Sequence, residues 1–112
     1  MKTLLIVTLL IAAVVLCAAA SNRDFWVINY SGKAMTSMHL SVHGLGDWYN
    51  FPLGSDRANG AQFKMNFYDD NAACVYDIRV TYDDGKVLSY TKGIDLCQWH
   101  TVEFDGDLAR WY

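Results

Sequence analysis

The chain has 112 residues, of which 53% are hydrophobic and 14% aromatic. That length allows one domain at most. Twelve acidic residues outnumber nine basic ones. The resulting net charge of −3 argues against nucleic acid or an anionic membrane surface as the partner, because either would require a basic patch.

The first 20 residues have the three parts of a secretory signal peptide. Lys2 is the only basic residue before the apolar run, residues 3–16 are apolar apart from two threonines, and alanines at 18–20 precede Ser21. An apolar run this short is marginal for spanning a bilayer, which takes about 20 residues. We expect a helical signal peptide, cleavage after Ala20, and export by the Sec pathway to the periplasm or the cell exterior. Stable membrane insertion is not expected after cleavage; a retained single-helix anchor is the alternative.

Cleavage would leave a single domain, residues 21–112, with all of the aromatic residues and a charge of about −4 once Lys2 is lost. Strand signals follow one another along it, and no window shows helical periodicity. The predicted strands cover residues 25–30, 35–43, 62–68, 74–82, 87–91 and 101–104. Pro52 marks the aromatic segment 48–53 as an edge piece or an ordered loop.

Each predicted strand has one apolar face, which is typical of a small two-layer antiparallel β-sandwich. We therefore predict an all-β fold. The residues expected to point inward are Phe25, Val27, Met38, Leu40, Val42, Phe63, Met65, Phe67, Tyr76, Ile78, Val80, Val102 and Phe104.

The second strand places Ser37, His39, Ser41 and His43 on its outer face. His39 and His43 stand about 13 Å apart at the standard rise per residue, so they cannot share a metal ion. Both histidines are expected on a solvated face. Asp77 and Arg79 share a face of the 74–82 strand, and we expect them to be able to pair there.

Cys74 and Cys97 are the two cysteines that remain once Cys17 leaves with the signal peptide. An oxidising compartment favours a disulfide between them, and so small a domain often needs such a staple. Residues 83–86 have the composition of a hairpin turn. A turn centred on Asp84 and Gly85 would place Asp95 opposite Cys74, with Cys97 just beyond, so that the thiols meet at the open end. Two buried free thiols are the alternative.

Acidic turn residues provide the only candidate metal ligands. Asp69, Asp70, Asn71 and Asp95 are expected near one end of the sheet, where oxygen ligands could hold Ca²⁺. A second grouping joins Asp83 and Asp84 with Asp105 and Asp107, if the last strand runs back beside the hairpin. Asp, Asn and Gly are also the residues that ordinary turns require, and plain turn chemistry is the simpler interpretation. No cofactor is otherwise indicated.

Aromatic residues outside the inward alternation give the main binding hypothesis. Trp48, Tyr49 and Phe51 form the candidate binding loop, while Trp99, Trp111 and Tyr112 lie in another loop and at the chain end. Exposed aromatic rings can stack on sugar rings or anchor a protein interface. The alternative is that these rings cap the open ends of a small sandwich.

Several of these residues together resemble a known pattern: Trp48, Leu53-Gly54, the run C-V-Y-D-I-R-V that begins at Cys74, Asp84-Gly85, and the D-L-C that ends at Cys97. They resemble an uncharacterised family of small exported proteins of Gram-negative bacteria with the pattern W…LG…CxYDIR…DG…DLC. The resemblance spans about residues 25–104, with departures at residue 49, where the family tends to carry glycine, and at 51–52. Members are sometimes labelled Tat-pathway signal proteins or argininosuccinate lyases; such lyases are large helical oligomers, so that label does not fit this domain. The resemblance implies export and the disulfide, and no established activity.

The sequence contains no nucleophile elbow, phosphate-binding loop or zinc-binding helix motif, and Glu103 is its only glutamate. We therefore expect a non-catalytic exported domain that binds another protein or an envelope component. A calcium- or carbohydrate-binding module is the alternative, and a small hydrolase is the third possibility.

Overall fold

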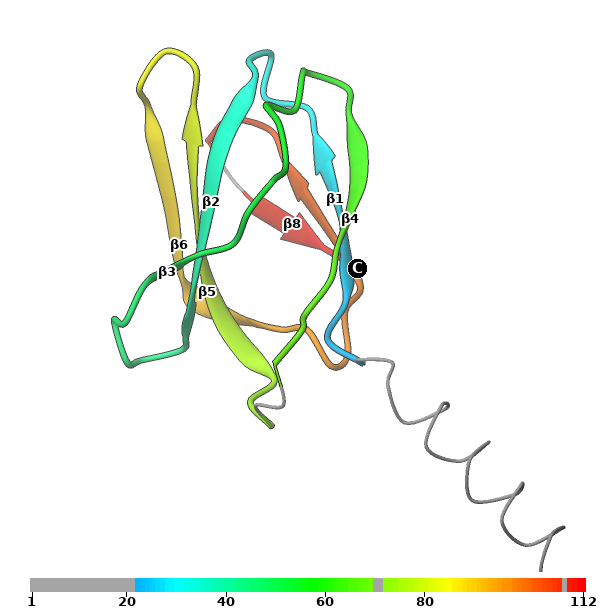
Figure 1. Ribbon diagram of the computed structural model, residues 1–112, viewed down its shortest axis with the longest axis vertical. Helices are drawn as coiled ribbons and strands as arrows, with labels where there is room; N and C mark the ends of the chain where they lie inside the picture. Colours follow the sequence, from blue (N-terminus) through cyan, green and yellow to red (C-terminus); the bar gives the residue numbers. More distant parts are fainter. Residues whose placement is uncertain (1–21, 70–71, 108) are drawn as a thin grey trace, which may run out of the picture.

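The computed structural model describes residues 22–69, 72–107 and 109–112; the predicted signal peptide lies outside them. The described chain folds as two four-stranded sheets that face each other, which confirms the all-β sandwich (Figure 1). None of the described segments forms a helix long and apolar enough to cross a membrane. The strands are β1 (Phe25–Asn29), β2 (Met35–Val42), β3 (Tyr49–Asn50), β4 (Gln62–Met65), β5 (Val75–Tyr82), β6 (Val87–Asp95), β7 (Thr101–Phe104) and β8 (Ala109–Trp111).

One sheet has the strand order β4-β1-β7-β8, and the other has the order β3-β2-β5-β6. All strand pairs are antiparallel except β1 and β7, which run parallel with Val27 opposite Val102. The prediction of antiparallel strands therefore holds for every pair but this one. The last two strands extend the β1 sheet and do not return beside the β5–β6 hairpin.

The predicted alternation of inward and outward residues is confirmed along most strands. Every residue expected in the core is buried except Val42, which is only partly covered. The prediction for Ser41 is wrong in the opposite sense, because the residue is expected on the outer, solvated face of its strand and is fully buried. Its hydroxyl accepts a hydrogen bond of 3.1 Å from the backbone N–H of Asp47, so the loop after β2 folds back over it.

The Cys74–Cys97 disulfide is confirmed, with the Cα atoms 5.2 Å apart. The predicted register is wrong by one residue, because Asp95 lies opposite Val75 and the Cys74 carbonyl accepts a hydrogen bond from Leu96. Two features cause the difference. The turn has three residues with Gly85 at φ 82°, and β6 carries a bulge where Asp77 faces the stretch 91–93.

The two open sides of the sandwich are closed by aromatic side chains. After the short edge strand β3 the chain crosses from one sheet toward the other, and Phe51 and Leu53 point into the core. The Phe51 ring packs edge-on against Phe67, with 5.0 Å between ring centroids. On the opposite side Tyr90 of β6 meets Trp111 of β8 at 4.9 Å. Capping by aromatic rings therefore explains part of the aromatic content.

Candidate functional site

The three residues of the candidate binding loop lie in three different environments. Trp48 packs on the outer face of its sheet, where the Arg79 guanidinium lies 4.2 Å from the centroid of a Trp48 ring. Phe51 is a core residue. Tyr49, on the edge strand β3, is 40% exposed and lies at the rim of the sandwich. The loop therefore does not present its aromatic rings as one surface.

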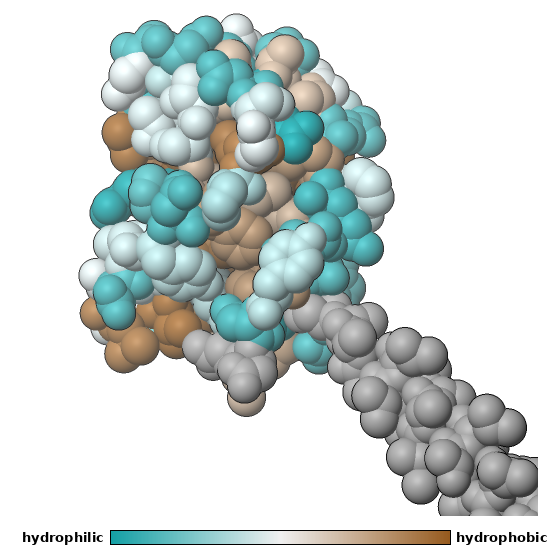
Figure 2. All heavy atoms as spheres, viewed as in Figure 1, coloured by the Kyte–Doolittle hydropathy of each residue, from teal (hydrophilic) through white to brown (hydrophobic). Residues whose placement is uncertain are grey.

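Tyr49 instead borders a hollow of about 290 Å³ between the edges β3 and β4. We call it the β3–β4 hollow. Phe51 and Phe67 lie at its base, and its remaining lining residues are Tyr49, Asn50, Pro52, Asn66, Tyr68 and Asp69. Figure 2 shows apolar atoms in a hollowed strip on this face, bordered on both sides by more polar side chains. A second depression of about 320 Å³ adjoins it and reaches Arg57 and Lys64.

A buried arginine holds the wall of this hollow in place. Arg23 is 4% exposed, and its guanidinium donates hydrogen bonds to the Tyr76 hydroxyl at 2.7 Å and to the Asp69 carboxylate at 2.6 Å. It also stacks over the Phe67 ring at 4.4 Å. These contacts tie the segment after β4 to β5 and to the start of β1. Arg23 also pairs with the Asp69 carboxylate, so this ion pair adds no net charge to the wall.

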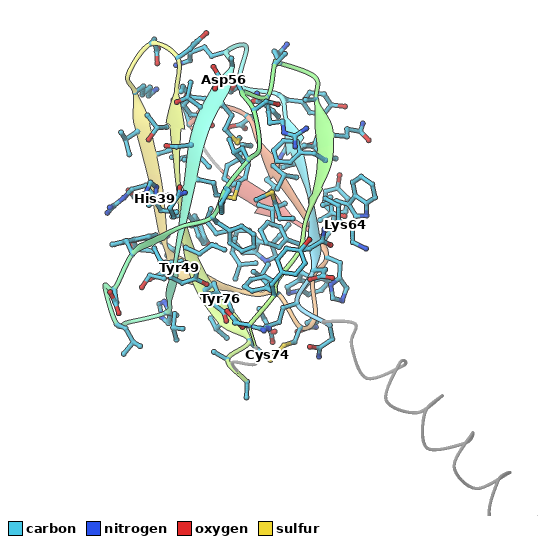
Figure 3. All side chains as sticks on the ribbon, viewed as in Figure 1. His39, Tyr49, Asp56, Lys64, Cys74 and Tyr76 are labelled. Atoms are coloured by element: carbon cyan, nitrogen blue, oxygen red, sulfur yellow. A yellow bond between two sulfur atoms is a disulfide. The ribbon has the colours of Figure 1, made fainter. Side chains whose placement is uncertain are left out.

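Tyr49 lies against this cluster. Figure 3 shows Tyr49 and Tyr76 close together toward the disulfide end. Burial is the main cause that raises the pKa of Tyr49 to about 12, with Tyr76 and Asp69 adding to the shift and Arg23 opposing it. The Tyr49 phenol therefore stays neutral, and able to donate a hydrogen bond, over the whole physiological pH range.

A second tyrosine gives a pH prediction. Burial, with smaller effects from Asp105 and Asp107, raises the pKa of Tyr82 to about 12. The phenol has a pKa of about 10 in the unfolded chain, so burying it in its neutral form stabilises the fold relative to the ionised form. This stabilisation is fully present below about pH 10 and is lost as the pH rises toward 12. Between about pH 9 and pH 12, the free energy of unfolding of wild type should fall by about 2 kcal/mol more than that of Tyr82→Phe. Urea unfolding at both pH values measures the difference. The exposed Tyr112→Phe is the control, and equal losses in wild type and Tyr82→Phe would contradict the assignment.

Two amide side chains in the hollow have no partner. Those of Asn50 and Asn66 make no hydrogen bond with any residue that the structure describes. The Tyr68 ring beside them is 93% exposed. The hollow thus combines apolar rings at its base with unused donors and acceptors at its rim. That combination is typical of small-ligand sites.

The acidic residues considered for calcium have other contacts. Asp69 bonds Arg23, and Asp95 accepts a hydrogen bond from the Cys97 backbone at 3.0 Å. Asp70 and Asn71 lie outside the described residues. Asp95 also lies close to the sulfur atoms of Cys74 and Cys97, in an arrangement that could hold a metal ion if the thiols were free. Both sulfur atoms form the disulfide, so they do not serve as thiolate ligands.

Two of the four carboxylates in the second acidic grouping, those of Asp84 and Asp107, are ion-paired at the opposite end of the sandwich. Lys33 lies 2.8 Å from Asp84, and Lys86 lies 2.9 Å from Asp107. The hydrogen bond from Lys33 is the main cause that lowers the pKa of Asp84. Asp105 accepts a hydrogen bond from the Asp107 backbone, as in an ordinary turn. These contacts favour turn chemistry for this group.

The histidines and Asp77 do not form the arrangement that was expected. Asp77 is buried and pairs with His43 at 2.8 Å, whereas Arg79 donates to the Ser89 hydroxyl, so the anticipated Asp77–Arg79 pair is wrong. His43 is half-exposed as expected, and His39 is partly covered. Ser41 lies opposite Asp77, but its hydroxyl bonds the Asp47 and Val42 backbones and not His43. The pair therefore lacks the bonded serine that a hydrolytic triad requires.

A larger depression of about 450 Å³ lies along the edge strand β8. It is lined by Glu103, Arg110, Trp111 and Tyr112 together with Ala109. Glu103 and Arg110 are paired with each other at 2.8 Å, and the Trp111 ring packs against Tyr90. Its charged groups are thus already matched, and we regard the β3–β4 hollow as the better candidate.

Sequence reasoning missed most of the hollow. Since Phe63, Met65 and Phe67 are the inward residues of the predicted 62–68 strand, Asn66 and Tyr68 fall on its outer face, and an aromatic ring at an outward position was the signal available. No feature of the sequence indicated that Arg23 would be buried beside this hollow. No family model matches the chain, and no curated protein or solved structure is significantly similar to it, so the hollow must be interpreted from its own residues.

Proposed function

We propose that the protein is a non-catalytic exported binding domain and that its ligand, a component of the cell envelope or of a partner protein, occupies the β3–β4 hollow. The observation that carries the proposal is the pair of unpartnered amides, Asn50 and Asn66, beside the exposed ring of Tyr68. Exposed polar groups that converge on an apolar base can bind a ligand without any rearrangement of the fold.

The surroundings of the hollow support a preformed site. Its base consists of core residues, and Arg23 fixes the segment that carries Tyr68 through bonds to Tyr76 and Asp69. A ligand would thus meet a base of rings held by the core, Phe51 and Phe67, and this lowers the entropy cost of binding.

Two features support the exported part of the proposal. The first 20 residues have the composition of a signal peptide, and the Cys74–Cys97 disulfide is of a kind that persists in oxidising compartments. The resemblance to small exported proteins agrees with both. We therefore propose that the domain acts in the periplasm or outside the cell.

Co-sedimentation with purified cell-envelope fragments tests the proposal. Wild-type protein should pellet with the fragments, and Tyr68→Ala should bind about tenfold more weakly, the cost of losing one aromatic contact of about 1.4 kcal/mol. Because Tyr68 is almost fully exposed, its removal should leave the fold intact. Tyr112→Ala removes another exposed tyrosine, which directly follows β8 at the opposite edge of the sheet from β4, and should bind like wild type. Equal binding by Tyr68→Ala and wild type would refute the proposal.

A further inference from the structure

We infer that the ligand of the β3–β4 hollow is a neutral oligosaccharide; this inference rests on the proposed function and specifies its ligand class. It depends on three properties of the hollow, namely the placement of its aromatic rings, the kind of its polar groups, and its charge.

The first property is the set of rings around the opening. Tyr49 stands on β3 and Tyr68 follows β4, so the two phenol rings come from opposite edges of the hollow. The exposed Pro52 ring lies on the segment that crosses between these edges. A pyranose ring presents a flat C–H face, and the electron-rich face of a tyrosine ring attracts such C–H groups. The apolar base provided by Phe51 and Phe67 continues that surface inward.

The second property is the type of the unused polar groups. Each side-chain amide of Asn50 and Asn66 offers two N–H donors and a carbonyl acceptor. Every sugar hydroxyl also donates and accepts, so adjacent hydroxyls on one ring match an amide on both counts. The Tyr49 and Tyr68 hydroxyls add two further groups with the same dual character. A fatty acyl chain or an apolar peptide side chain would leave these groups unpaired, which costs binding free energy.

The third property is charge. Among the described residues that line the hollow, the carboxylate of Asp69 is the one formal charge, and the Arg23 guanidinium lies 2.6 Å from it. This pairing leaves no net charge on the described lining of the hollow to attract an ionic ligand, and the cations Arg57 and Lys64 line only the adjoining depression. A phosphate, an acidic peptide or a polyamine would lose its hydration without gaining an opposite charge. A neutral ligand avoids that cost.

The size of the hollow sets the expected affinity. Its volume of about 290 Å³ lies at the small end of ligand sites and suits one or two sugar rings, with further rings passing toward the adjoining depression. An open site of this kind buries little of its ligand. We expect a dissociation constant on the order of 1 mM for a trisaccharide.

The outer face of the β4-β1-β7-β8 sheet also exposes aromatic rings and serves as the internal comparison. Trp26 on β1 is 48% exposed, and Tyr112 lies on the same face beside Thr101, whose backbone it bonds. The depression of about 450 Å³ along β8 borders this face through Glu103, Arg110 and Tyr112, but its two charged groups, Glu103 and Arg110, are paired with each other at 2.8 Å. This face should contribute nothing to sugar binding.

A titration followed by ¹H–¹⁵N NMR tests the inference with defined probes: cellotriose, maltotriose and tri-N-acetylglucosamine, each to about 10 mM. At least one should shift the amide signals of residues 49–51 and 66–69. Tyr68→Ala should weaken that binding about tenfold, and Asn66→Ala by a factor of several. Tyr112→Ala should bind like wild type, and tri-galacturonate, an anionic trisaccharide, should bind at least about tenfold more weakly than the best neutral probe.

The inference is overturned if none of the three neutral probes shifts these signals, if the shifts centre on Trp26 and Tyr112, or if tri-galacturonate binds more tightly than every neutral probe. Envelope fragments separate this failure from failure of the proposed function. Binding that survives proteinase K and is lost after periodate, which cleaves vicinal diols, supports a saccharide. Binding that depends on Tyr68 but is lost after proteinase K and survives periodate overturns the saccharide and leaves the binding domain standing. Binding that ignores Tyr68→Ala removes both.

Discussion

Replacing both Cys74 and Cys97 with serine is expected to lower the free energy of unfolding by about 3 kcal/mol. The two cysteines are 23 residues apart in sequence, so the bridge closes a loop of moderate length in the unfolded chain. In the chain-entropy account, opening that loop restores conformational freedom to the unfolded state and so destabilises the fold. A domain of this size has only about 5–15 kcal/mol of stability, which makes the loss a large fraction of the total.

The position of the bridge adds a structural reason for this loss. The bulge in β6 separates the end of the β5–β6 ladder, where Val75 faces Asp95, from the part nearer the turn. Beyond the bulge the hairpin is held by few backbone bonds, yet it carries the fully buried side chains of Ile94 and Leu96. Without the disulfide this end should open first, and these side chains would lose their cover.

Urea unfolding measures the effect, and the expected shift of the midpoint is roughly 2 M. Adding a reductant to wild-type protein should reproduce the behaviour of the Cys74→Ser/Cys97→Ser variant, whereas the same reductant should leave the variant unchanged. That comparison separates the loss of the bridge from any effect of the serine side chains. Coinciding midpoints for the oxidised wild type and the variant would show that the ladder alone secures this end.

The fold class and the facing of most side chains could be predicted because a strand exposes alternate residues to opposite sides. This rule reports the face of a residue and not the neighbour of a strand. The rule therefore could not predict that β7 lies parallel to β1, or that residues Ala109–Trp111 form a further strand, β8. The prediction for Ser41 was wrong for a related reason, since alternation does not report that the loop after β2 folds back and covers the outer face of its own strand.

The candidate site was predictable only in part. Aromatic residues near Tyr49 were identified because they break the alternation, and two of them line the hollow, Tyr49 at its rim and Phe51 at its base. The prediction that they form a single binding surface is wrong, because Trp48 packs on the outer face of the sheet and Phe51 is buried in the core. The other side of the hollow follows β4, and the facing of β3 and β4 across the open edge depends on the order of strands in both sheets. Local patterns do not contain that information.

Gly93→Ala is expected to destabilise the domain by about 3 kcal/mol, far more than an ordinary substitution on an edge strand. Gly93 lies in the bulge of β6 at φ 84°, and an added Cβ would come within 2.7 Å of Val75 Cγ1 and 3.1 Å of the His43 ring. The left-handed backbone costs a non-glycine residue about 1 to 2 kcal/mol. The contact adds to this, because Val75 is stiff about χ1 and His43 is held by its 2.8 Å contact with Asp77.

Gly85→Ala separates the two contributions, since Gly85 has almost the same φ of 82° but no atom within 4 Å of the added Cβ. It should therefore lose only about 1 kcal/mol in urea unfolding. Val75→Ala removes the clashing methyl group, and Val75 is 38% exposed, so this truncation alone should cost little. In the Val75→Ala background Gly93→Ala should cost about 1 kcal/mol less than in wild type, which a double-mutant cycle measures directly. If Gly93→Ala and Gly85→Ala lose equal stability, or if Val75→Ala relieves nothing, then the close approach at the bulge is not what requires glycine there.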